Sequence, residues 1–298
     1  MEKKCASVRK FFLELSRKEP DDGSTESSTF PEEIVILTDV SNERYRKFRE
    51  EERKVNLFIR LIKGKLIVYD MPSSVHGSVQ FSTGLMMTWH PQLDIHTGLD
   101  LSIDENYYCA DIAVIPAGNG LNPTIIVEVG VSESLQSLHD LAKSYFSEQT
   151  DIQVYLALKF WPLRQDGTAA MIALLYLREN RIQIRPGNIR WFNNTDPNMV
   201  ISFGNAPIND ITMEFLTGKV PNNRYFGYFN NGDTVCDDEE IPIYQIPIPT
   251  SPIFTGCPGG VPPETPDNFN LDLWTIQVKA LYYLNKEQQR RQQQQQQQ

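Results

Sequence analysis

The stretch NPTIIVEVGVSES, Asn122 to Ser134, places a single carboxylate inside an otherwise apolar strand. Six of the eight residues from Thr124 to Val131 are β-branched, a pattern that predicts a strand buried on both faces. Glu128 stands at the centre of this strand. Because an unpaired buried charge is costly, Glu128 requires a cation, a hydrogen-bond donor or a proton. The chain must therefore fold so that such a partner reaches Glu128.

The composition is that of a globular protein that folds without disulfides. The chain has 298 residues, of which 40% are hydrophobic, and this length allows one or two domains. Its four cysteines are far apart and lack zinc-ligand spacing, so we expect free thiols in an intracellular compartment, cytoplasmic or nuclear. No apolar run reaches the roughly 18 residues of a membrane span, so no membrane partner is expected. The net charge of −10 weighs against nonspecific coating of nucleic acid, but allows a local basic groove beside an acidic metal site.

Periodicity divides the chain into four segments. Residues 1–30 are polar and predict a disordered tail, although their basic residues leave a transit peptide open. Residues 31–189 follow the order strand, strand, helix, strand, strand, strand, helix, strand, which predicts a mixed α/β domain. Residues 190–270 are rich in Asn, Pro and Gly, and predict an irregular extension without a regular central strand. Residues 271–298 predict an amphipathic helix and a poly-Gln tail, with Leu271, Trp274, Val278 and Leu281 or Tyr282 facing inward.

Asp111 and Glu128 form a candidate metal site. Asp111 opens the strand ADIAVIP, and a short turn separates this strand from that of Glu128, so we expect the two strands to be neighbours. Two carboxylates that point at one spot repel each other unless a divalent cation lies between them. Mg²⁺, or Mn²⁺ in its place, suits a site of one or two carboxylates with water and phosphate. The alternative is that Glu128 is half exposed or paired with an arginine.

A nuclease site needs a further cation to position water or stabilise developing charge. The position two residues after Glu128 is Gly130, which cannot supply one. On the following predicted helix, Lys143 lies on the flank of the apolar stripe, and its long side chain could reach back over the sheet. The alternative for Lys143 is a solvated surface lysine. Gln149 falls near the centre of the stripe, where its amide needs a partner, so it is a candidate lining residue for which a structural role is favoured.

Four segments, in order, resemble the putative restriction endonuclease family of the PD-(D/E)XK nuclease superfamily. They are IRLIKGKLIVYDMPSSVHGSVQ, ADIAVIP, PTIIVEVGVSES and LHDLAKSYFSEQTDIQVYLAL, and they lie within about residues 35–160. The resemblance implies a restriction-endonuclease-like mixed sheet flanked by helices. The chain departs from the family pattern at Ala110, where a proline is usual, and at Asp151, where a glycine is common. Both departures bear on activity more than on fold.

The resemblance also implies roles for individual residues. Asp111 and Glu128 would bind the metal, and Lys143, eight residues before Asp151, would be the displaced catalytic lysine. His76 would line the site, although helix capping or packing explains this residue equally well. No such role is implied for residues 190–298, which fall outside the resemblance.

Three functions are compatible with the sequence. The favoured one is a metal-dependent nuclease that hydrolyses phosphodiester bonds in nucleic acid, in DNA rather than RNA. The second is a catalytically silent nuclease-fold protein that binds partners, with the C-terminal helix and glutamine tract as the candidate surface. The third is an unrelated α/β protein. A homodimer is compatible with each of them.

Overall fold

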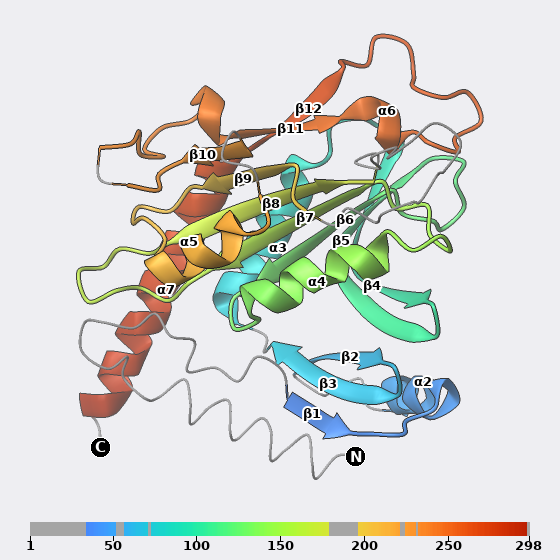
Figure 1. Ribbon diagram of the computed structural model, residues 1–298, viewed down its shortest axis with the longest axis horizontal. Helices are drawn as coiled ribbons and strands as arrows, with labels where there is room; N and C mark the ends of the chain where they lie inside the picture. The colour runs from blue at the N-terminus through green and yellow to red at the C-terminus, as the bar shows by residue number, and fades with distance from the viewer. Residues whose placement is uncertain are drawn as a thin grey trace.

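Two neighbouring apolar strands, β5 (Asn106–Pro116) and β6 (Ile125–Gly130), lie near the middle of the fold. All six residues of β6 are buried, which confirms the strand predicted around Glu128. The computed structural model describes residues 34–51, 57–70, 73–178, 196–220, 224–230 and 232–296 (Figure 1). Within these ranges, no helix has the length and apolar character needed to cross a membrane.

The main sheet is mixed and has ten strands. Its path is β1-β3-β2-β5-β6-β7-β8-β9-β10, and β4 pairs with β5 beside this path. The pairs β6–β7 and β9–β10 are parallel, and the other pairs are antiparallel. The strands not yet bounded on this path are β1 (Ile34–Leu37), β2 (Phe58–Ile62), β3 (Lys65–Asp70), β4 (Leu93–Ile103), β7 (Val154–Phe160), β8 (Met171–Leu177), β9 (Met199–Ser202) and β10 (Tyr225–Gly227).

The sheet divides at β5. β4 pairs with β5 along its whole length, and so occupies one edge of that strand. The other edge is shared, because β2 meets β5 at Tyr107 and β6 meets it from 112 to 114. Asp111 lies between these two contacts. Asp111 therefore lies where the pairing of β5 changes from β2 to β6.

Helices cover both faces of the sheet, as the α/β class predicts (Figure 1). On one face, α4 (Leu135–Tyr145) and α5 (Asp210–Thr217) pack against alternate residues of β6 and β7, such as Ile126 and Ala157. On the other face, α3 (Ser74–Met86) and α7 (Leu273–Gln296) pack against the remaining residues, such as Val127 and Leu156. A further helix, α2 (Asn42–Glu51), packs against the β1–β3–β2 end of the sheet.

Serine caps fix where two of these helices begin. The hydroxyl of Ser73 accepts a hydrogen bond from the backbone nitrogen of His76 at 3.0 Å, and Ser134 does the same for Ser137 at 3.0 Å. Each cap satisfies a backbone donor that the first helical turn leaves free. The sequence offers Ser73 or Ser74 for the first cap and Ser132 or Ser134 for the second, and the structure has Ser73 and Ser134. The first cap places His76 at the start of α3.

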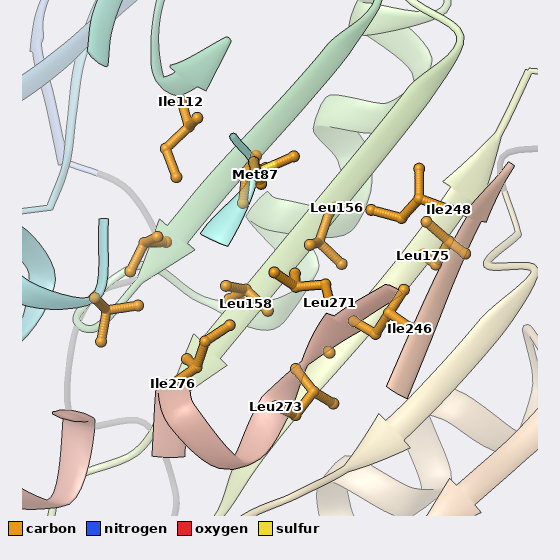
Figure 2. Packing of buried hydrophobic residues seen from close by; sticks show 14 of the residues in the cluster. Met87, Ile112, Leu156, Leu158, Leu175, Ile246, Ile248, Leu271, Leu273 and Ile276 are labelled. Atoms are coloured by element: carbon orange, nitrogen blue, oxygen red, sulfur yellow. The ribbon is translucent and has the colours of Figure 1, made fainter. Parts of the chain in front are cut away.

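The chain beyond residue 195 adds strands to the sheet and residues to its core. β9 and β10 continue the main sheet past β8. β11 (Gln245–Pro249) and β12 (Asn268–Asp272) form a separate two-stranded pair. The 3-10 turn η2 (Pro242–Tyr244) precedes β11, and the short helix α6 (Thr250–Ile253) lies between the two strands in the chain. Prolines alternate with isoleucines in β11, so Ile246 and Ile248 turn inward into the cluster that holds Leu156 and Leu175 (Figure 2). A two-stranded pair tolerates prolines that a central strand would not. The predicted boundary at residue 189 lies in 179–195, outside the described residues.

The C-terminal helix faces the core with a stripe that matches the predicted one only in part. Leu271 belongs to β12, where it pairs with Ile246, and α7 begins two residues later. The buried apolar positions of α7 are Leu273, Ile276, Ala280 and Leu284, as Figure 2 shows for the first two. Of the residues predicted to face inward, Trp274 and Leu281 are half-buried and pack against the same cluster. Val278 is exposed, and so is Tyr282, the alternative to Leu281.

Candidate functional site

Asp111 and Glu128 adjoin the end of the ladder that joins β5 and β6. The last antiparallel pair of this ladder is Ile112 with Val127, next to both acids. Their side chains have partners from different helices: Glu128 contacts Tyr145 of α4, and Asp111 contacts His76 of α3. The predicted adjacency of the two strands is confirmed. Both side chains are buried, and Glu128 has no exposed surface. Each carboxylate must therefore find its partner inside the protein.

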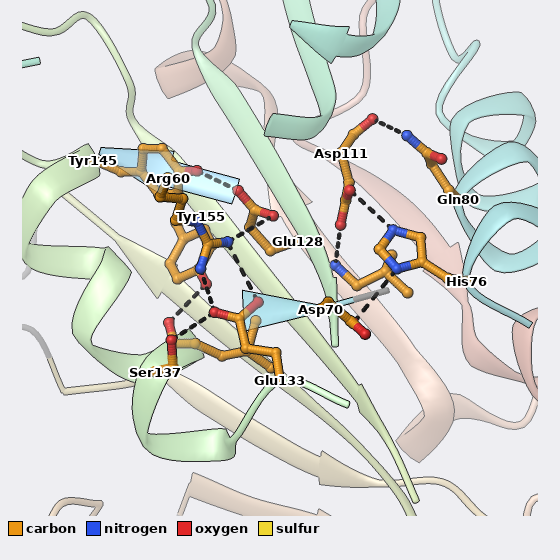
Figure 3. A network of polar contacts seen from close by, with 12 residues as sticks. Arg60, Asp70, His76, Gln80, Asp111, Glu128, Glu133, Ser137, Tyr145 and Tyr155 are labelled. Atoms are coloured by element: carbon orange, nitrogen blue, oxygen red, sulfur yellow. Dashed lines mark hydrogen bonds and ion pairs between the residues drawn. The ribbon is translucent and has the colours of Figure 1, made fainter. Parts of the chain in front are cut away.

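Arg60 of β2 lies between Glu128 and Glu133 (Figure 3). Its Nη2 is 3.3 Å from Glu128 Oε2 and 3.3 Å from Glu133 Oε2, and its Nη1 donates to Glu133 Oε1. The hydroxyl of Tyr145 donates to the other oxygen of Glu128, and the guanidinium carbon lies 3.4 Å from the centre of the Tyr69 ring. We call Arg60, Glu128 and Glu133 the arginine cluster. Pairing with an arginine, the alternative that the sequence left open for Glu128, is what the structure contains.

The arginine cluster sets two carboxyl groups against one guanidinium. Burial raises the pKa of Glu128 well above its usual value, and Arg60 opposes that rise. Burial raises the pKa of Glu133 as well, against the same arginine and a hydrogen bond of 2.6 Å from the hydroxyl of Ser137. For Arg60, burial disfavours the charge, but the two glutamates and Tyr69 outweigh it and raise its pKa. The two acids thus depend on Arg60 for their charge balance.

A second cluster joins His76 of α3 to Asp111 and to Asp70 at the end of β3 (Figure 3). His76 Nε2 lies 2.9 Å from Asp111 Oδ1, and His76 Nδ1 lies 3.6 Å from Asp70 Oδ2. The second oxygen of Asp111 accepts from the backbone nitrogen of Val129 at 2.7 Å, and Gln80 donates to the Asp111 carbonyl at 2.6 Å. Burial opposes a charge on His76, but Asp111 and Asp70 together raise its pKa to about 10. We call His76, Asp70 and Asp111 the histidine cluster.

Asp70 also holds the loop that brings Glu133 to Arg60. Its carboxylate accepts from the backbone nitrogens of Val131 and Ser132 at 3.1 and 3.2 Å. Glu133 follows directly in this loop, and α4 begins two residues later. The histidine cluster therefore fixes the backbone that positions an acid of the arginine cluster, and the two clusters form one network.

Lys159 of β7 is a third buried cation, and our sequence reasoning missed it. The parallel register pairs it with Gly130, so a lysine does stand beside the glycine, supplied by the neighbouring strand. Its Nζ donates to the carbonyl of Val131 at 2.8 Å, and burial lowers its pKa to about 8. The signal was present in the sequence, because a single charge interrupts the apolar run IQVYLALKF as Glu128 interrupts its own strand.

Two predicted site residues lie at the surface. The side chain of Lys143 is 61% exposed, and its Nζ lies 3.8 Å from Asp140. The prediction that its ammonium turns toward the buried carboxylates is wrong, because Lys143 follows the solvent side of α4 while Tyr145 faces inward. Gln149 is also exposed, and it accepts from the backbone nitrogen of Asp104 at 3.2 Å. α4 ends at Tyr145, so its apolar stripe does not reach Gln149.

The network does not fit a divalent cation as it stands. Among the described residues, no group of three His, Cys, Asp or Glu side chains is placed to hold a metal. Both carboxylate oxygens of Glu128 are engaged, with Tyr145 and Arg60, and both of Asp111 are engaged, with His76 and a backbone nitrogen. Mg²⁺ needs free carboxylate oxygens and room for several waters. The contacts instead describe a closed network whose acids are balanced by the protein's own cations.

Comparisons with known proteins leave the family of this chain open. No family model matches the sequence, and no curated protein matches it significantly. Among solved structures, the chain is similar to a crystal structure described as a putative nuclease belonging to DUF820 from Anabaena variabilis ATCC 29413. The identity is 13% and the TM-score is 0.32, over 52% of this chain and 84% of that chain. A TM-score this low carries no weight for family or function.

Proposed function

We propose that this protein is a catalytically silent binding module on a nuclease-like α/β scaffold. One observation carries the proposal: the carboxylates predicted to bind metal are buried against internal cations, Arg60 for Glu128 and His76 for Asp111. A metal-dependent nuclease needs such carboxylates to hold the ion that activates water and screens the phosphate. A network closed in this way supports binding through the surface rather than hydrolysis.

Exposed apolar side chains on α3 and α7 support a protein partner. Phe81 and Leu85 stand one turn apart on α3, and Val278 and Tyr282 stand one turn apart on α7; all four are exposed. The two helices pack against each other. Large apolar side chains left exposed on neighbouring helices are typical of interaction surfaces. The net charge of −10 favours a protein partner over nucleic acid.

The second candidate is a metal-dependent nuclease acting on DNA, with Mg²⁺ or Mn²⁺ held by Asp111 and Glu128. Two observations favour it: both acids adjoin the last pair of the β5–β6 ladder, and Lys159 stands beside Gly130 where a nuclease cation would be useful. This function requires Arg60 and His76 to release the carboxylates.

A plasmid-nicking assay separates the two candidates. With Mg²⁺ or Mn²⁺ present, we expect the wild-type protein to cut no more than Glu128→Ala prepared in parallel. Asp140→Ala, which removes an exposed acid of α4, is the matched control. Metal-dependent cutting by wild type and Asp140→Ala, lost in Asp111→Ala and Glu128→Ala, would replace the silent module by the nuclease.

Cross-linking in a cell extract tests the binding half of the proposal. We expect the double variant Phe81→Ser/Tyr282→Ser to lose partners that wild type captures, because it removes the exposed apolar side chains of α3 and α7. Leu121→Ser is the matched control, since Leu121 is equally apolar and 76% exposed but lies in the loop between β5 and β6. Identical capture by all three proteins would show that these helices are not the binding surface.

A further inference from the structure

We infer that the partner of the proposed binding surface is a second copy of this chain, docked about a two-fold axis that sets α7 antiparallel to α7 of the other copy. The surface consists of Phe81 and Leu85 on α3 and Val278 and Tyr282 on α7, and we call it the α3–α7 surface. The inference rests on the proposed function in one respect, because it takes this surface as the binding surface and names what binds there.

The helices α3 and α7 run in opposite directions. At the start of α3, the backbone nitrogen and the hydroxyl of Ser74 donate to Glu287 in the second half of α7, at 2.9 and 2.6 Å. Just beyond the other end of α3, Trp89 stacks on Phe269 of β12, the strand that leads into α7, with 5.0 Å between the ring centres. The two helices are therefore held together at both ends.

The apolar side chains of the α3–α7 surface gather on one side of this helix pair. The helices rise equally per residue, so Phe81, seven positions after Ser74, stands level with residue 280 of α7, between Val278 and Tyr282. Both helices pack on the same face of the sheet, so their exposed sides point away from it. Phe81 and Tyr282 are 64% and 59% exposed. Aromatic side chains exposed in this way are typical of protein interfaces.

An acidic run, residues 237–240, lies beside the start of α7. All four residues are Asp or Glu, and all four are exposed. Gln277 of α7 donates to the Cys236 carbonyl at 2.6 Å, and Asp272, which directly precedes α7, accepts from the backbone nitrogen of Glu240 at 3.0 Å. The acidic run is therefore fixed at both ends to the segment that begins α7.

A basic group stands in the second half of the same helix. Lys286, Arg290 and Arg291 are exposed there. Because α7 has 24 residues and is about 36 Å long, the two signs of charge are well separated within one chain. Neither charged end can therefore satisfy the other without a second molecule.

This separation selects both the partner and its orientation. A second copy carries the complement of each charged end, so a single two-fold axis makes both contacts at once. An axis perpendicular to α7 sets the basic end of each copy against the acidic run of the other, with the apolar side chains at the centre. An axis parallel to α7 sets the two basic ends together and is disfavoured. The net charge of −10 opposes pairing only weakly, because charges more than about 8 Å apart are largely screened at physiological salt.

Sedimentation equilibrium measures whether the chain pairs. We expect the wild type to have twice the 34.2 kDa mass of one chain at about 100 µM, well above the micromolar dissociation constants of the weakest interfaces of standard size. Phe81→Ser/Tyr282→Ser should be a monomer, because it removes the aromatic centre of the surface. Leu121→Ser, an exposed apolar position in the loop between β5 and β6, is the matched control and should remain a dimer.

Charge reversal tests the antiparallel arrangement. Arg290→Glu/Arg291→Glu sets like charges against the acidic run of the other copy and should weaken the dimer by about tenfold or more. Adding Asp238→Arg/Glu239→Arg to the same chain restores opposite charges across the axis and should recover most of that affinity. Circular dichroism should show all variants folded, since the changed residues are exposed.

A monomeric wild type at this concentration would overturn the inference, and so would a dimer that survives Phe81→Ser/Tyr282→Ser. A four-residue variant that pairs no better than Arg290→Glu/Arg291→Glu would do the same, because recovery depends on contact between the two charged ends. These outcomes are separate from the proposed function. A monomer that still captures other proteins through Phe81 and Tyr282 would leave the binding module standing, and DNA cutting by a dimeric wild type would end the silent module and leave the dimer.

Discussion

The arginine cluster and the histidine cluster each bury two carboxylates against one cation, but they do so by different means. In the histidine cluster, backbone nitrogens also serve the acids: Val129 donates to Asp111, and Val131 and Ser132 donate to Asp70. In the arginine cluster, no backbone donor to Glu128 or Glu133 is found among the described contacts, and the donors to these two carboxylates are side chains. Removal of the cation should therefore cost more in the arginine cluster.

The largest effect is expected for Arg60→Met. The change leaves two buried carboxylates without their cation, and breaking a buried pair in this way typically costs about 3–5 kcal/mol of unfolding free energy. Urea denaturation at pH 7 measures the loss. Arg49→Met is the control, because its ion pair with Asp100 is partly exposed and should be worth about 1 kcal/mol or less.

A triple variant sharpens this first prediction. When Arg60→Met is combined with Glu128→Leu and Glu133→Leu, most of the lost stability should return, because buried ion networks are often no more stable than apolar residues of similar size. A triple variant as unstable as Arg60→Met alone would show that the acids stabilise the fold through Tyr145 and Ser137 rather than through Arg60.

A smaller and pH-dependent effect is expected for His76→Asn, with a loss of about 1.5–3 kcal/mol at pH 6, the range for a hydrogen bond to a charged group. The pKa of His76 is about 10 in the folded protein, above its unfolded value near 6.5. The folded state therefore binds the proton more tightly, so the contribution is complete below about pH 6.5 and is lost as the pH rises toward 10. The difference in stability between wild type and His76→Asn should shrink over this range.

Urea denaturation from pH 6 to pH 9 measures that difference. Lys159 titrates in the same range but is present in both proteins, so its effect largely cancels. His96→Asn on β4 provides a matched control for a histidine outside the network. A wild-type advantage over His76→Asn that stays constant with pH would mean that His76 is neutral and serves only as a packed hydrogen-bond partner.

The two clusters also show how far the sequence could predict this molecule. Local patterns were sufficient to predict β6 and to show that Glu128 needs a partner, and they narrowed the capping residue of α3 and of α4 to two serines each. The sequence could not identify this partner, because Arg60 is 68 positions away in the chain and comes close to Glu128 only when β2 and β6 pair with the same edge of β5. His76 is 35 positions from Asp111, and the two residues meet only when α3 packs on the sheet. Contacts between elements are set by the tertiary arrangement, which local periodicity does not encode.

Lys143 and Lys159 also differ in how well the sequence could predict their positions. A lysine on the flank of a helical stripe can point either way, so periodicity left the orientation of Lys143 open. A lysine inside an apolar strand has no such freedom, and it must be buried with a partner. The rule that singled out Glu128 would have found Lys159, had it been applied to cations as well as to acids.

The smallest effect is expected for Lys143→Ala. Its side chain is exposed and its ion pair with Asp140 spans 3.8 Å on the helix surface, so the loss should lie within about 0.5 kcal/mol, as for most surface changes. The measurement is the same urea denaturation. Lys159→Ala is the informative partner, since it removes a buried donor to the Val131 carbonyl and should cost more. If Lys143→Ala proved the more costly of the two, Lys143 rather than Lys159 would be the lysine that stabilises the network, and the assignment of Lys143 to the surface would be wrong.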